Sequence, residues 1–266
     1  VLILCPFLAL AGSAEPFATQ VVAATGLGTN PFTNDPAAIL GKPTLENVDS
    51  VNGGPSGLIA SSLVYAPWRS CSTGQNAVCT IPAGASVIVG FTTPIQNLAA
   101  NPEGKDFIVF GNSFFLNSLG TIAWNSDMDA VRIGAGPFAE PVTVSVSPDL
   151  LRWYTYAQPT ADGLWPTQAR SWNTFTHAWG REQDFQTPVP ATLSVSAVQN
   201  HTVAEAILFY RGSGGGTAFD LAPSGFSQIR YIRFESNGGE VDAVARVHLG
   251  RTEAPTRGSA SPPVRL

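Results

Sequence analysis

The chain has 266 residues, of which 44% are hydrophobic and only 12% are charged, against roughly 25% charged in ordinary soluble domains. A formal net charge of −5 and the absence of a Lys/Arg cluster argue against nucleic acid as a partner. No apolar run reaches the roughly 18 residues of a membrane-spanning helix. The length suffices for one large core, and we expect a single domain over residues 15–249.

The first segment, residues 1–14, is an apolar run that ends in small residues. Gly12 and Ala14 fit the last positions before a signal-peptidase cut, and Ala9 and Ala11 offer a second such pair. The run is short for a bilayer and has no flanking charge, so we interpret it as part of a secretory signal. A buried N-terminal strand is the alternative. The sequence therefore predicts a secreted protein, extracellular or at the cell surface.

Residues 35–41 are the best candidate for a short helix. Asp35 suits the N-cap, Pro36 suits the first helical position, and Gly41 suits the residue after the helix end. Residues 44–62, which follow, are rich in Asn, Gly and Ser and are expected to form a loop.

Cys71 and Cys79 lie in a polar segment, whereas Cys5 lies within the expected signal. Two cysteines so close in an oxidising compartment would ordinarily pair, and closing the small loop would stabilise the fold by roughly 2–3 kcal/mol. We therefore expect a Cys71–Cys79 disulfide. A metal site is disfavoured because no histidine or second cysteine pair lies nearby.

From about residue 85 onward, short β-branched and aromatic runs alternate with Gly, Pro, Asn and Ser. Residues 142–147 alternate valine with threonine or serine, which predicts one buried face and one solvated face. Residues 228–234 carry apolar side chains on both faces, as in a strand that is covered on both sides. The predicted strands are 86–91, 106–111, 142–147, 153–157, 206–210, 228–234 and 241–249. So many strands without intervening helices predict an all-β fold, an antiparallel β-sandwich.

Two further stretches do not have a strand pattern. Residues 158–190 read as a long, irregular, Trp-rich insertion, and residues 250–266 read as a disordered tail.

Several short motifs occur in an order that resembles a group of secreted bacterial cell-surface proteins. They are NDPAAILGKPT (34–44), ASVIVGFTTPI (85–95), GKDFIVFGNSFF (104–115), AEPVTVSVSPDLLRWYTY (139–156), GGTAFDLA (215–222) and EVDAVARV (240–247). That group is similar in turn to galactose-binding-like (discoidin-type) jelly rolls, so the resemblance implies a jelly-roll topology more than an activity. The sequence departs from the group's pattern where SPDL (147–150) replaces a DG turn and where Thr217 replaces a common Asp.

Four residues at strand edges within these motifs form a candidate calcium site: Asp106, Asn112, Asp220 and Asp242. Hard oxygen ligands of this kind suit Ca²⁺, which would have a structural role here. The alternative is that Asp106 and Asp220 cap turns or accept backbone N–H groups.

A second constellation is aromatic and lies in the Trp-rich insertion. Its candidate ligand-binding residues are Trp165, Arg170, Trp172, Asn173, His177 and Trp179. Exposed Trp rings could stack on sugar rings while the polar neighbours bind hydroxyls. Alternatively, the rings form a small core that keeps the insertion ordered.

The sequence contains neither a G-x-S-x-G nor an H-E-x-x-H motif. Carboxylate pairs such as Glu182 with Asp184, or Glu205 with Asp220, could serve a glycosidase, but spacing in sequence does not show their separation. The favoured function is non-catalytic recognition of an extracellular glycan or cell-surface polymer. A polysaccharide hydrolase or lyase and a structural protein-interaction domain are the alternatives.

Overall fold

The computed structural model describes residues 14–48 and 57–248. The predicted tail and all but the last residue of the predicted signal lie outside these ranges, as does the middle of the predicted loop 44–62. Among the described residues, no helix is both long enough and apolar enough to cross a membrane.

The described chain consists mainly of short strands joined by turns and a few helical segments. The strands are β1 (Gln20–Thr25), β2 (Glu46–Val48), β3 (Leu58–Ala60), β4 (Cys79–Thr80), β5 (Ser86–Gln96), β6 (Phe107–Gly111), β7 (Phe114–Asn117), β8 (Ile133–Phe138), β9 (Thr143–Ser147), β10 (Tyr154–Thr155), β11 (Arg170–Asn173), β12 (Ala178–Glu182), β13 (Thr217–Phe219), β14 (Gln228–Glu235) and β15 (Glu240–Arg246). The helical segments are η1 (Pro36–Ile39), η2 (Pro67–Thr73), η3 (Pro102–Gly104), α1 (Val195–Val198), α2 (Val203–Phe209) and η4 (Ala222–Ser224).

Two antiparallel sheets form the centre of the fold. One has the strand order β1-β5-β14-β9-β10 and the other has the order β13-β6-β15-β4. The predicted all-β, antiparallel class is therefore confirmed. The jelly-roll topology implied by the resemblance stays a prediction, because the sheets are small and open.

One hydrophobic cluster fills the space between the two sheets. It takes Val87 and Phe234 from the five-stranded sheet and Phe107 and Val244 from the four-stranded sheet, all fully buried. Phe107 stacks on Phe219 of β13, with ring centroids 4.9 Å apart. In β6, for example, Phe107 and Val109 point into the space between the two sheets, as in a sandwich.

The faces of β9 and β14 differ from the sequence expectation. In β14 the register shifts between Ile229 and Tyr231, and this bulge leaves Ile229 in the same buried cluster as Phe234. In β9 the face predicted to be solvated is buried, because Ser145 and Ser147 have no exposed surface. Their hydroxyls hydrogen-bond to Thr155 and to the following turn, which satisfies them without water.

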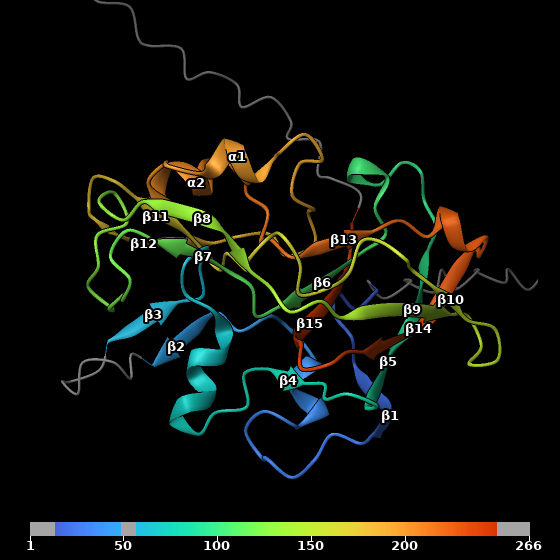
Figure 1. Ribbon diagram of the computed structural model, residues 1–266. Coiled ribbons are helices and arrows are strands. Elements are labelled where there is room, and N and C mark those ends of the chain that lie inside the picture. The colour runs from blue at the N-terminus through green and yellow to red at the C-terminus, as the bar shows by residue number, and fades with distance from the viewer. Residues whose placement is uncertain (1–13, 49–56, 249–266) are drawn as a thin grey trace, which may run out of the picture.

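The four-stranded sheet is covered on its outer face as well. Ile108 and Phe110 of β6 and Ala243 of β15 pack there with Phe185, whose ring meets that of Phe110 edge-on at 5.5 Å. Figure 1 shows the resulting order: the five-stranded sheet on the right, the four-stranded sheet in the middle, and the small hairpins with α1 and α2 on the left. A second large cluster, which we call the helix core, includes Ile207 and Tyr210 at α2 and Phe115 of β7.

The two ends of the described chain lie side by side. Ala18 donates its N–H to the carbonyl of Val244, and Arg246 donates its N–H to the carbonyl of Pro16. The Arg246 guanidinium also donates to the carbonyls of Glu15 and Thr93, so it joins the N-terminal segment to the end of β5.

The predicted helix at 35–41 is confirmed as the 3₁₀ helix η1. Asp35 accepts the N–H of Ala37, and Gly41 follows the helix with φ +83°. The predicted strand at 206–210 is wrong, because these residues belong to α2 and its C-cap. Thr202 and Glu205 form a capping box there, which starts a helix at Val203.

Candidate binding site

The Trp-rich segment is not an irregular insertion, because β11 and β12 form a hairpin within it. Asn173 closes the turn by accepting the N–H groups of Phe175 and Thr176 at 2.9 and 3.2 Å. His177 follows with φ +47°, in the left-handed region, and returns the chain into β12. Asn173 is thus a turn residue, rather than a group free to bind a ligand.

Trp172 and Trp179 are paired across this hairpin. Their ring centroids are 5.1 Å apart and their planes meet at 79°, so the two rings do not form one flat platform. Both rings are half-buried against the helix core. The Trp172 indole N–H donates to Asp129 at 2.8 Å. These contacts support the small-core interpretation of the two tryptophans.

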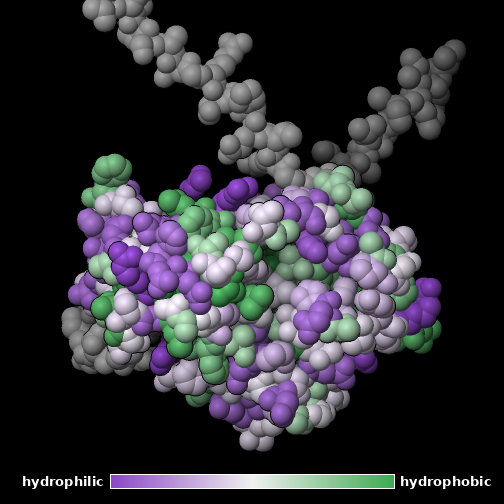
Figure 2. All heavy atoms as spheres, turned by 45° about the horizontal axis from the view of Figure 1, so that its top comes forward, coloured by the Kyte–Doolittle hydropathy of each residue, from purple (hydrophilic) through white to green (hydrophobic). Residues whose placement is uncertain are grey.

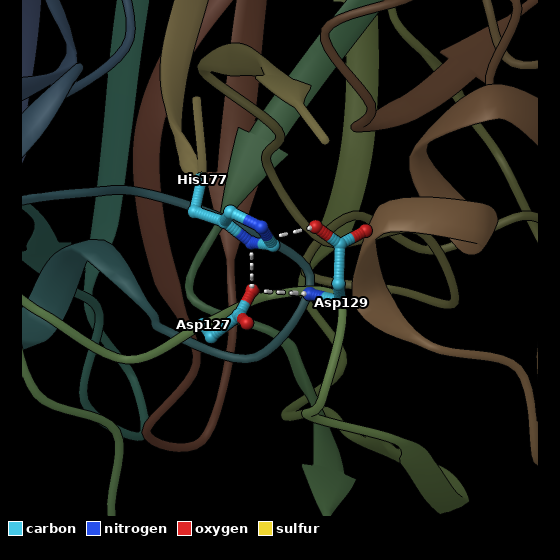
Figure 3. A group of neighbouring side chains, drawn as sticks. All are labelled: Asp127, Asp129 and His177. Carbon is cyan, nitrogen blue, oxygen red and sulfur yellow. Dashed lines mark hydrogen bonds and ion pairs between the residues drawn. The ribbon is translucent and has the colours of Figure 1, made fainter. Parts of the chain in front are cut away.

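His177 completes a polar group at the end of the hairpin (Figure 3). Its Nδ1 lies 3.1 Å from a carboxylate oxygen of Asp127 and 3.2 Å from one of Asp129. The hydrogen bond that Asp127 accepts from the imidazole raises the pKa of His177. The pKa of Asp127 is lowered by the backbone N–H of Asp129 and then by His177. The three groups attach the hairpin to the loop between β7 and β8.

The Arg170 side chain is also occupied by a contact within the protein. Its guanidinium forms an ion pair with Glu46 of β2 at 2.5 Å. Of the six residues predicted to bind a ligand, only Trp165 remains, and it lines a large pocket.

That pocket has a volume of about 430 Å³, within the range of small-molecule sites. Trp165 forms part of its wall and packs edge-on against Tyr210, with ring centroids 6.0 Å apart. The remaining walls come from residues 103 and 105, 139 and 141, 158–160, 162–164, 189–191 with 193, and 216–218. Figure 2, which turns the helices toward the viewer, shows apolar residues gathered in the middle of this side of the molecule.

Polar side chains on the wall of this pocket are free to bind a ligand. Within the described part of the chain, Glu103, Lys105 and Gln158 take part in no side-chain hydrogen bond or ion pair, although all three line the pocket. An indole ring with nearby uncommitted acceptors and donors suits a polyhydroxylated ligand. Sequence patterns indicate Trp165 but not these three residues, because the three are dispersed along the chain and belong to no motif.

The four predicted calcium ligands do not form one site. Asp106 accepts N–H groups from Leu98 and Leu221, and Asp220 accepts that of Ala222. Asp242 instead accepts both the N–H and the hydroxyl of Thr44. These hydrogen bonds confirm the turn-capping alternative for Asp106 and Asp220.

The fourth predicted ligand, Asn112, accepts the N–H of Trp68. The three aspartates form no metal-sized group within the part of the chain that the structure describes. The prediction that these four residues share one ion is therefore wrong, because each oxygen serves a different loop.

The predicted disulfide is also wrong, because Cys71 and Cys79 are free thiols. Cys71 packs with Ala77 and Val78 in a small cluster, whereas Cys79 points into the core between the sheets. Neighbouring residues of an extended chain point to opposite sides, so Val78 faces Cys71 and Cys79 faces away from it. Burial raises the pKa of Cys79 to about 12, which suppresses its reactive thiolate.

A group of three carboxylates was not anticipated from the sequence. Oxygens of Glu140, Asp162 and Glu240 all lie within 4.8 Å of one another. Glu140 and Glu240 also line a pocket of about 350 Å³ together with Trp68, Phe138 and other residues. The three acids are far apart in sequence, and no spacing rule connects them.

Comparisons with protein-family models, with curated proteins and with solved structures returned no match to this chain.

Proposed function

We propose that this protein is a secreted, non-catalytic recognition module for an extracellular glycan or cell-surface polymer, and that it binds its ligand in the pocket beside Trp165. The observation that carries the proposal is this pocket of about 430 Å³, where an indole ring lies among uncommitted polar side chains. Sugar rings have apolar faces that pack on aromatic rings, and their hydroxyls need donors and acceptors such as Lys105, Gln158 and Glu103. The resemblance to secreted bacterial surface proteins is consistent with such a ligand.

The hydrolase or lyase alternative has one observation in its favour, the carboxylate group of Glu140, Asp162 and Glu240. An inverting glycosidase needs about 6.5–9.5 Å between its two carboxyls to admit a water, whereas a retaining glycosidase needs about 5–5.5 Å. These oxygens lie within 4.8 Å of one another, which argues against the inverting arrangement only. Asp162 and Glu240 are also buried, which leaves little access for a substrate. The geometry therefore favours binding over this catalysis.

The test is a pull-down of the full chain on insoluble polysaccharides together with a glycan array, with Ca²⁺ and with EDTA. Reducing ends are assayed in the same tubes. We expect retention without released sugar, and we expect Trp165→Leu to weaken retention at least tenfold, a loss of about 1.4 kcal/mol. The leucine keeps apolar bulk against Tyr210, and the melting temperature of the variant verifies that it is folded.

Trp153→Leu is the matched control, because Trp153 stacks under Arg233 on the five-stranded sheet and does not line the pocket. Unchanged retention in the Trp165 variant would place the ligand elsewhere. Released sugar would favour the enzyme alternative. If neither retention nor product is seen, a structural or protein-binding role is favoured.

A further inference from the structure

The three-carboxylate group brings together three separate parts of the fold. Glu140 lies between β8 and β9, Asp162 lies in the segment after β10, and Glu240 is the first residue of β15. Glycine permits the approach at one point, since a Cβ at Gly111 would lie only 2.6 Å from a carboxylate oxygen of Asp162. The backbone is thus shaped so that the acids can meet.

Two of the acids are almost completely buried. Asp162 is 2% exposed and Glu240 is 7% exposed. Asp162 accepts the N–H of Asn112 at 2.7 Å and, more weakly, that of Glu240 at 3.5 Å. These two bonds fix the direction of the Asp162 carboxylate but supply no positive charge.

One oxygen of this group has no partner. Glu240 Oε1 accepts the hydroxyl of Thr80 at 3.3 Å, whereas its buried Oε2 has no hydrogen-bond partner among the described residues. An unpaired buried carboxylate oxygen is costly, and natural folds rarely retain one without an ion or a water. A cation between the carboxylates would supply the missing partner and would reduce the repulsion among the three acids.

No cationic side chain supplies the missing charge. The ion pairs within the described ranges include none to Glu140, Asp162 or Glu240. Arg69 lines the neighbouring pocket but makes no ion pair with these acids. The charges that face Glu240 are those of the other two acids, Glu140 and Asp162, so they repel its carboxylate rather than neutralise it.

We propose that Glu140, Asp162 and Glu240 bind one hard divalent cation, best matched by Ca²⁺. Two oxygens that share a Ca²⁺ at about 2.4 Å are at most about 5 Å apart, and these oxygens lie within 4.8 Å of one another. The adjoining pocket of about 350 Å³ leaves room for the waters that complete the coordination shell. The ion would cross-link three segments. Asp162 also lines the pocket beside Trp165, but Ca²⁺ binding is measured without any glycan, so failure of one proposal does not decide the other.

The other acidic group, Asp127 and Asp129 with His177, lacks the observation on which this site depends. Asp127 and Asp129 already accept hydrogen bonds, from His177 and the indole of Trp172 among others, and all three side chains are partly or largely exposed. It therefore provides a matched control elsewhere on the same chain.

The test uses the full chain, first freed of metal with EDTA. CaCl₂ is titrated by calorimetry, thermal unfolding is followed with and without Ca²⁺, and Tb³⁺ luminescence is excited through tryptophan, since Trp68 lines the pocket. We expect one site per chain and an increase in Tm of about 5 °C or more at one hundred times the Kd.

Glu240→Gln and Asp162→Asn should each abolish the Ca²⁺-dependent shift in Tm and the Tb³⁺ signal. Both changes preserve shape, and asparagine tolerates the φ of +46° at position 162. In EDTA, Glu240→Gln should melt at or above the wild-type temperature, which shows that the variant is folded. Asp127→Asn should keep the full response. The proposal is overturned if Ca²⁺ leaves the wild-type Tm unchanged, or if the shift survives both variants.

Discussion

Leu150 adopts a backbone conformation that leucine rarely takes. It lies in the turn between β9 and β10 with φ +67°. The turn is supported by side chains: Ser147 accepts the N–H of Leu150 at 2.8 Å, and Asp149 accepts those of Leu151 and Arg152. These hydrogen bonds offset the steric cost of the left-handed conformation, which is about 1–2 kcal/mol for a non-glycine residue.

Leu150→Gly should therefore raise the free energy of unfolding by about 1 kcal/mol, because glycine takes positive φ without the Cβ clash. Urea denaturation measures the change. Leu151→Gly is the control, since Leu151 is 86% exposed and has no positive φ. It should lower stability slightly through the extra freedom of the unfolded chain. Equal effects of the two changes would contradict the account of the turn.

The β11–β12 hairpin shows how an element can be aromatic without forming a flat binding face. Trp172 and Trp179 turn one side toward the helix core, and the hairpin tip is attached to the loop that carries Asp127 and Asp129. Phe175, at the turn, is 95% exposed. The hairpin therefore has one exposed ring at its tip and two rings that pack against the protein.

Trp172→Ala should lower the free energy of unfolding by about 2–3 kcal/mol, somewhat less than for a fully buried tryptophan, because packing and the bond to Asp129 are both lost. Phe175→Ala in the same hairpin should change stability by less than about 0.5 kcal/mol. Chemical denaturation of both variants gives the comparison. A small loss at Trp172 would return that ring to the list of ligand-binding candidates.

Among secondary-structure elements, the sequence predicts strands well where apolar residues alternate between turn signals, as in β5, β6, β9, β14 and β15. It fails for α2, where the run AILFY has a strand-like composition, although Thr202 and Glu205 upstream form a recognisable capping box. It also fails at the bulge in β14, because an extra residue changes which side chains share a face.

Site residues are less predictable because they meet only through the tertiary fold. Trp165 is recognised as a candidate binding residue because it lies in a Trp-rich segment of the sequence. Glu103 and Lys105, by contrast, reach its pocket from a turn that lies some sixty residues earlier in the chain. Glu140 and Glu240 are adjacent in space because β15 returns to the centre of its sheet. Local patterns carry no information about such encounters.

The molecule as a whole buries several acids whose pKa values lie above their ordinary values. Burial raises the pKa of Asp242 to about 7, and Glu240 and Asp162 are raised in the same direction. Over the interval between the ordinary value and the raised value, the folded chain binds more protons than the unfolded chain. The free energy of unfolding therefore falls as pH rises through that interval.

In EDTA, the melting temperature should accordingly be highest near pH 4 to 5 and should decrease as pH rises toward 8. Asp242→Asn should flatten part of this slope up to about pH 7, because an amide does not ionise. Asp149→Asn is the control, since hydrogen bonds from the Arg152 and Leu151 backbones lower the pKa of Asp149 to about 2, below the interval. Thermal unfolding at a series of pH values tests both variants. An equal dependence of Tm on pH in wild type and Asp242→Asn would show that Asp242 does not contribute to the slope.

The adjacent ends of the described chain determine how the fold would respond to a pulling force. Residues 16–18 run antiparallel to residues 244–246. Residue 15 and residue 247 therefore lie at the same end of this pair of segments. Tension applied between them would load the hydrogen bonds one after another, as in unzipping, rather than all at once, as in shear. The Arg246 guanidinium, which holds the carbonyls of Glu15 and Thr93, would be among the first contacts to carry that load. The two central sheets would separate only after these contacts had broken.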